Sequence, residues 1–210
     1  MLSINLEEFL AVLERYNLTI WPLQIITFLL GIIALFFSLR RKKYSDQIIL
    51  AILSFYWLWN GIVFCPFYWA PIYKYAYLFG VFCIIQGLLF LIGVFRPNIS
   101  FGHYNNLHSI IGILFIIYAM VGYQISGYFL GHIYPKYFPF GLVPCPTTVY
   151  TFGIFLITSK KFPKYYLIVP LIVAIAGFLA VYIGVLEDIG LIIAGLIGTY
   201  LLLRRFSKVN

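Results

Sequence analysis

The sequence predicts an all-α fold: a polytopic membrane bundle of about seven transmembrane helices, with its N-terminus outside and its C-terminus in the cytoplasm. Three observations lead to this prediction. Hydrophobic residues make up 63% of the 210 residues and charged residues only 10%, whereas a soluble domain carries far more charge. The apolar residues form runs long enough to cross the hydrocarbon core as helices. The basic residues lie in short clusters between these runs, as in the loops of membrane proteins.

The N-terminal segment, residues 1–19, is expected to lie on the outer face of the membrane as an amphipathic helix that covers about residues 5–16. Asn5 is a suitable N-cap residue for this helix. Apolar side chains recur with helical spacing and give one stripe, formed by Leu6, Phe9, Leu10 and Leu13. No basic residue precedes Arg15, so no cleavable signal peptide is expected.

Residues 20–210 form the expected transmembrane domain. Its predicted spans are roughly 20–39, 47–65, 75–95, 107–129, 147–159, 166–184 and 188–203. The last two spans belong to one apolar stretch, which Leu186, Glu187 and Asp188 interrupt. That stretch is about two spans long, so a tight turn is expected at the acidic pair.

The orientation follows from the distribution of charge. All but three of the 14 Lys and Arg residues fall in loops on one side, which the positive-inside rule assigns to the cytoplasm. The exceptions are Arg15, Lys74 and Lys136. The acidic residues show the opposite distribution, since only Asp46 lies on the cytoplasmic side. The net charge of +8 therefore reflects topology, and nucleic-acid binding is not expected.

The span at 147–159 is too short to cross a bilayer. As a helix it would measure roughly 20 Å at ~1.5 Å per residue, against about 30 Å of hydrocarbon. Upstream, a series of residues forbids a regular helix: Pro139, Gly141, Pro144 and Pro146. Irregular backbone is therefore expected at membrane depth, where it is tolerated only inside protein or along a wet cavity. Broken helices of this kind mark the binding sites of many transporters.

Cys145 is the first candidate site residue in this stretch. If Pro146 is the first helical residue, Cys145 is the N-cap, and the helix dipole there favours a thiolate. Thr147 and Thr148 complete the first turn and offer two hydroxyl groups. These features indicate a reactive or substrate-binding thiol, or an anion pocket. The alternative is a small residue buried in a tight turn, with the threonines bonded to the backbone.

Three further residues join the candidate substrate site. Glu187 supplies a carboxylate at the outer membrane edge, where it can attract cations or relay protons. His132 lies in the long outer loop, and Asn60 lies inside the second span. Interhelical hydrogen bonding is the alternative role for Asn60 and for Gln86 in the third span.

The sequence identifies no cofactor and leaves the cysteines open. His132 with Cys65 and Cys145 could supply soft ligands for a thiophilic metal, although no spacing rule groups them. A disulfide between Cys65 and Cys145 is a second alternative, and burial as small apolar residues is a third. Cys83, inside the third span, is expected to be buried.

Several short motifs carry a resemblance to a known group of proteins. They are Tyr16-Asn17 with Trp21-Pro22, Gly131 to Pro135, Pro144-Cys145-Pro146-Thr147-Thr148, and Glu187 to Gly190. Together they resemble an uncharacterised family of prokaryotic polytopic membrane proteins, a domain of unknown function, over nearly the whole chain. The resemblance implies a multi-pass protein of the prokaryotic cytoplasmic membrane and implies no activity.

The favoured function is a small-solute or ion transporter with an outward-facing site under the loop at 144–148. Two other classes stay open: a membrane-embedded enzyme or redox protein that uses Cys145, and an accessory subunit. An accessory subunit is expected to expose a flat face of small residues, such as Gly190, Ala194 and Gly198. The expected partners are the lipid bilayer and a small molecule or ion, with assembly into a homo-oligomer left open.

Overall fold

The computed structural model describes residues 5–96, 98–102, 107–158 and 163–207. Lys160, Lys161 and Lys208, which contribute to the predicted orientation, lie outside these ranges. The described residues form helices and no strand, apart from one isolated bridge between Phe101 and Thr158. In chain order the helices are α1 (Leu6–Thr19), α2 (Leu23–Leu39), α3 (Ser45–Trp59), η1 (Asn60–Trp69), α4 (Ala76–Phe95), α5 (Leu107–Ile117), η2 (Tyr118–Gly122), α6 (Tyr123–Phe129), α7 (Pro144–Leu156), η3 (Lys164–Leu167), α8 (Ile168–Tyr182) and α9 (Asp188–Ser207).

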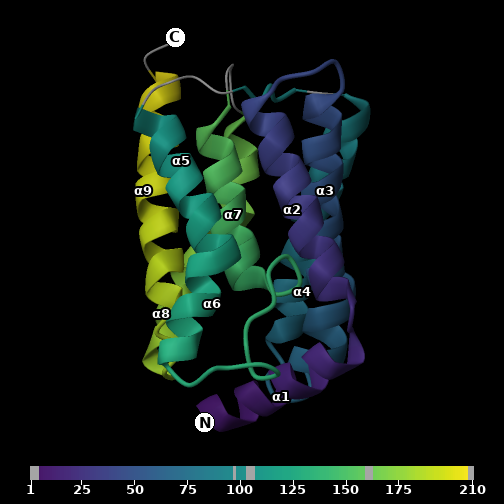
Figure 1. Ribbon diagram of the computed structural model, residues 1–210, viewed down its shortest axis with the longest axis vertical. Coiled ribbons are helices and arrows are strands. Elements are labelled where there is room, and N and C mark those ends of the chain that lie inside the picture. Colours follow the sequence, from purple (N-terminus) through teal and green to yellow (C-terminus); the bar gives the residue numbers. More distant parts are fainter. Residues whose placement is uncertain (1–4, 97, 103–106, 159–162, 208–210) are drawn as a thin grey trace.

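The helices from α2 to α9 run lengthwise in one bundle, and α1 lies across one end (Figure 1). The described start of the chain lies at that end and α9 finishes at the other, as expected for an odd number of crossings. Four continuous helical stretches within the described residues are long and apolar enough to cross a membrane: Ser45–Trp69, Ala76–Phe95, Leu107–Phe129 and Lys164–Tyr182. The pair α1 and α2 meets the same criteria only when joined, and it bends by 87°. These helices make the chain a membrane protein, while the count of seven spans stays a prediction.

The second predicted span is longer than expected because α3 continues into a π-helix. Pro66 lies inside η1 and has no N–H to donate to a regular helical ladder. At the end of this segment the N–H of Ala70 donates to the carbonyl of Cys65 at 2.8 Å, and this spacing of five residues is typical of a π-helix. The wider helix carries the backbone past residue 65 to Trp69, and π-helical segments of this kind are frequent at functional sites.

The short helix α7 forms the centre of the bundle. Every residue of α7 is buried except Cys145, which is half-buried. Gly112 of α5 and Gly153 of α7 allow close contact, since a side chain at either would come within 2.7 Å of the other's carbonyl oxygen. The predicted shortness of this span is confirmed, because α7 has 13 residues.

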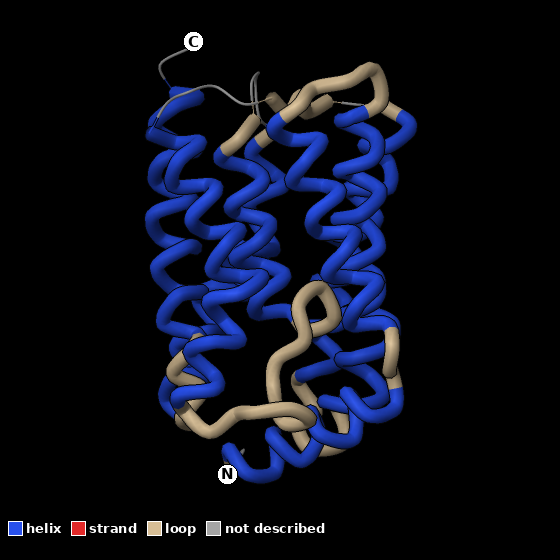
Figure 2. The backbone as a smooth tube through the Cα atoms, in the orientation of Figure 1, coloured by secondary structure: helices blue, strands red, loops and turns tan. Residues whose placement is uncertain are grey.

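The loop between α6 and α7 enters the bundle. Figure 2 shows it rising from the α1 end to about half the height of the helices. At its tip, Phe140 packs edge-on against the rings of Tyr56 and Tyr150, and its ring fills the space left by the missing side chain of Gly31. Gly141 follows with φ of +77°, a conformation that favours glycine. The prediction of irregular backbone enclosed by the helices is therefore confirmed.

Helix α1 holds this loop in place. As predicted, the Asn5 side chain caps the helix by accepting from the N–H of Glu7 at 3.1 Å. The amide of Asn17 donates to the carbonyl oxygens of Pro135 and Tyr137 at 2.7 and 2.8 Å. The hydroxyl of Tyr16 donates to the carbonyl of Leu142 at 2.8 Å. Because the loop lacks regular structure, these bonds satisfy backbone groups that a helix would pair internally.

Candidate functional site

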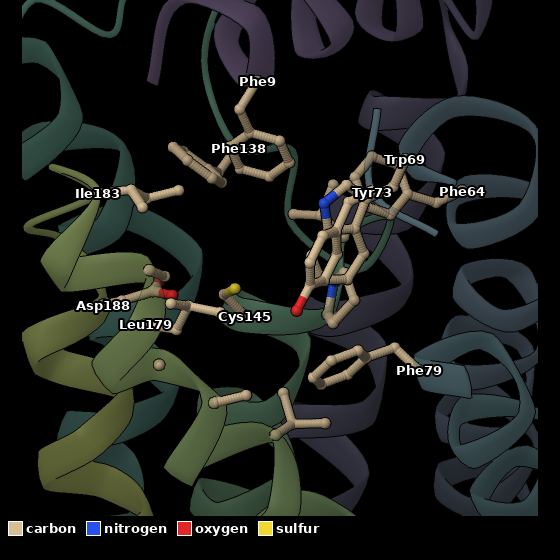
Figure 3. Close-up of a pocket in the computed structure, with 16 residues that line it drawn as sticks. Phe9, Phe64, Trp69, Tyr73, Phe79, Phe138, Cys145, Leu179, Ile183 and Asp188 are labelled. Atoms are coloured by element: carbon tan, nitrogen blue, oxygen red, sulfur yellow. The ribbon is translucent and has the colours of Figure 1, made fainter. Parts of the chain in front are cut away.

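A cavity of about 60 Å³ lies at the α1 end of the bundle, directly beside the first turn of α7. It is partly open, and its walls come from α1, η1, α4, the inserted loop, α7, α8 and the start of α9 (Figure 3). Six aromatic side chains surround it: Phe9, Phe64, Trp69, Tyr73, Phe79 and Phe138. The surface that they present is apolar. The cavity lies where the sequence predicts a site, at the 144–148 stretch.

Cys145 lines this cavity, but it is not the N-cap of α7. That prediction is wrong, because Pro144 is the first helical residue and Val143 takes the cap position. Proline suits the first position, where its missing N–H costs no hydrogen bond. Cys145 therefore lies inside the first turn, and within the described residues no base makes a hydrogen bond with its thiol.

Asp188, rather than Glu187, brings a carboxyl group to the cavity. It lies beside Leu179 and Cys145, across the cavity from Trp69 and Tyr73 (Figure 3). The side chain is fully buried, and its Oδ1 accepts a hydrogen bond from the hydroxyl of Tyr123. The second oxygen, Oδ2, has no partner among the described residues. A buried carboxyl oxygen without a donor is costly, so this atom needs an explanation.

Glu187 faces the opposite direction and pairs with His132. The Nδ1 of His132 and the Oε1 of Glu187 are 2.5 Å apart, and both side chains are buried. The absence of a side chain at Gly127 makes room, because a Cβ there would lie 3.1 Å from Oε1. The structure thus brings two predicted site residues together, but the pair does not line the cavity.

The remaining predicted site residues support the inserted loop. The hydroxyl groups of Thr147 and Thr148 donate to the carbonyls of Val143 and Pro144, each four residues back in the chain. The amide of Asn60 donates to the carbonyl of Tyr56 at 2.8 Å, and contacts the Gly141 carbonyl and the Thr147 hydroxyl at 3.4 Å. All three side chains are buried, and none lines the cavity.

The cysteines are free thiols. Cys65 and Cys83 are buried next to each other, and Cys145 is half-buried nearby. The described residues contain no group of three or more His, Cys, Asp and Glu that could hold a metal ion. The proposed set of Cys65, Cys145 and His132 therefore does not form a metal site in the part of the chain that the structure covers.

The sequence missed the aromatic wall and the role of Asp188. Trp69 and Tyr73 belong to the aromatic residues near span ends, which are common at membrane interfaces. Burial, with a smaller contribution from Tyr75, raises the pKa of Tyr73, so this phenol stays neutral. The sequence places Asp188 only in the acidic turn between the last two spans and favours Glu187 as the site carboxylate. The sequence did carry a signal for Asp188, since two adjacent carboxyl groups lie at this turn and only one of them was assigned a role.

A family model covers residues 6–210, and its description reads "Family of unknown function (DUF6064)". The chain belongs to this family. The match includes α1, the inserted loop and every residue that lines the cavity. Comparisons with curated proteins and with solved structures gave no match. Membership in the family brings no activity with it, so the function must be inferred from the geometry.

Proposed function

We propose that this protein is a small-solute carrier of a prokaryotic cytoplasmic membrane, which binds its substrate in the cavity beside Cys145. The supporting observation is the cavity itself, enclosed by apolar helices and by an inserted loop at the break before α7. Irregular backbone inside a membrane bundle is tolerated where it serves a cavity, and such breaks recur at transporter sites. The substrate would enter from the outer face and contact the thiol and the aromatic wall.

The same geometry disfavours the other two classes. A thiol enzyme needs a base in hydrogen-bond contact with the nucleophile, and the described residues offer Cys145 none. An accessory subunit was expected to expose the small residues of α9. Instead, Gly190 packs on the ring of Tyr118 and Gly198 packs on Phe152, while Ala194 is fully buried. This face of α9 packs against neighbouring helices of the bundle, so it is not available to a partner protein.

A carrier exposes its site to each side of the membrane in turn, so the thiol of Cys145 should be accessible to a reagent from either side. We expect a small, membrane-impermeant methanethiosulfonate cation to label Cys145 both in right-side-out and in inverted vesicles. The variant for this test carries Cys65→Ala and Cys83→Ala, so that Cys145 is the only thiol. Labelling is measured by mass spectrometry of the intact protein.

Two control variants define the sidedness of the vesicles. In a cysteine-free background, Lys136→Cys in the outer loop should label only from outside, and Lys42→Cys only from inside. Labelling of Cys145 from one side alone would contradict a carrier. Labelling only after denaturation would indicate that the Pro-Cys-Pro turn has a purely structural role.

The orientation gives a separate prediction. Because all but three of the 14 basic residues lie in loops assigned to the inner face, the C-terminus is expected in the cytoplasm. A fluorescent protein fused after the last residue should therefore be bright, and alkaline phosphatase fused at the same place should be inactive. An active phosphatase fusion would reverse the assignment of inside and outside.

A further inference from the structure

We propose that the ligand of the cavity is a small organic cation with apolar substituents, such as a quaternary or protonated amine, held by Asp188 and the aromatic wall. This inference rests on the proposed function and names its substrate class. It comes from three properties of the cavity: the aromatic character of its wall, the carboxyl group at its edge, and the signs of the charges around it.

The aromatic wall is the first property. Six ring-bearing side chains line one small cavity, and they come from five different segments of the chain. The faces of aromatic rings attract cations, with Trp the strongest, and cages of several rings recognise quaternary ammonium groups. An aliphatic wall would hold a neutral apolar molecule equally well, so the predominance of rings favours a cation.

Asp188 is the second property. Its carboxyl group is removed from water, and Oδ2 has no hydrogen-bond partner among the described residues. A buried carboxyl group is stable when it holds a proton or a cationic partner. Asp188 lines the cavity on the side of Leu179 and Cys145, opposite the rings of Trp69 and Tyr73, so a cation in the cavity would lie between a carboxyl group and ring faces (Figure 3).

The surrounding charges are the third property. Among the described residues no Lys, Arg or His lines the cavity. The nearby His132 is already bonded to Glu187, so it does not neutralise Asp188. The indole Nε1 of Trp69 also has no partner among the residues that the structure describes, and it can donate to a hydroxyl or ether oxygen of the same ligand. An anion would find no positive charge in this cavity, and a cation finds both a carboxyl group and ring faces.

The test compares two probes of the same shape that differ in charge. Choline carries a trimethylammonium group, and 3,3-dimethylbutan-1-ol has a carbon atom in place of the nitrogen. Binding to the full-length protein in lipid nanodiscs is followed by calorimetry and by the quenching of Trp69 fluorescence. We expect choline to bind at least about tenfold more tightly than the alcohol, and Trp69→Phe to remove the fluorescence change.

Two variants examine the origin of this preference. Asp188→Asn keeps the shape and the acceptor for Tyr123, and it should lower choline affinity about tenfold or more while the affinity for the alcohol changes less than about twofold. Should Asp188→Asn fold poorly, Phe79→Leu serves as a second variant, since it replaces a ring in the wall with an aliphatic side chain. It should reduce the ratio of the two affinities, whereas Phe95→Leu, on the exposed face of the same helix, should not.

Equal affinity for the two probes, or no binding of choline, would overturn the inference of a cationic ligand. An unchanged choline affinity in Asp188→Asn would also overturn it, because the carboxyl group would then make no contribution. The labelling of Cys145 from both faces does not depend on the charge of any ligand. The proposed carrier function and the proposed ligand class can therefore fail separately.

Discussion

Replacing His132 with Leu is expected to destabilise the folded protein by about 3–5 kcal/mol, because it leaves Glu187 buried without its partner. The two side chains are 5% and 0% exposed, so water cannot replace the imidazole. Glu187 Oε2 already lacks a partner, and the substitution would leave the whole carboxyl group unpaired. The free energy of unfolding can be measured by SDS titration in mixed micelles.

Two controls separate this effect from simple loss of volume. The double variant His132→Leu with Glu187→Met removes both polar side chains and should be less destabilised than His132→Leu alone, since a well-packed apolar pair is often as stable as a buried polar pair. Lys136→Ala breaks a half-exposed pair with Glu14 and should cost less than about 1 kcal/mol. A single variant as stable as the wild type would show that the His132–Glu187 pair contributes nothing to folding.

Replacing Phe140 with Ala is expected to cost about 3–5 kcal/mol and to release the inserted loop. The ring is 4% exposed and lies between Tyr56, Tyr150 and the gap at Gly31. Its removal would leave a void at the tip of the loop, where few backbone hydrogen bonds resist movement. The loop contains Lys136. Faster tryptic cleavage at this residue, together with a lower free energy of unfolding, is therefore the expected result.

The matched control is Phe95→Ala on α4. Phe95 is 79% exposed, so removing its ring should leave no void and should change neither stability by more than about 1 kcal/mol nor cleavage at Lys136. If Phe140→Ala is cleaved no faster than Phe95→Ala, the loop is held by the hydrogen bonds of Tyr16 and Asn17 alone. That outcome would contradict the anchoring role of the ring.

Most of the fold could be predicted from local properties of the sequence. The apolar runs place the helices, since each run must bury its backbone polar groups in a helix to enter lipid. The prolines and Gly141 indicate the break before α7 because proline and glycine act on their own backbone. The exact start of α7 was missed by two residues, since Pro144 and Pro146 are equally suited to a first turn and packing selected Pro144.

The site was predicted less completely, because contacts between distant segments decide it. Sequence alone pointed to Cys145 and to the acidic pair at the α8–α9 turn, and the cavity lies beside Cys145 and Asp188. The pairing of His132 with Glu187, 55 residues apart in the chain, depends on how α6 and the turn pack together. Glu187 is the last residue of the turn and Asp188 is the first residue of α9, so the way this turn packs against its neighbours decides which carboxyl group lines the cavity. Only the tertiary structure determines that packing, and it places Asp188 at the cavity and Glu187 against His132.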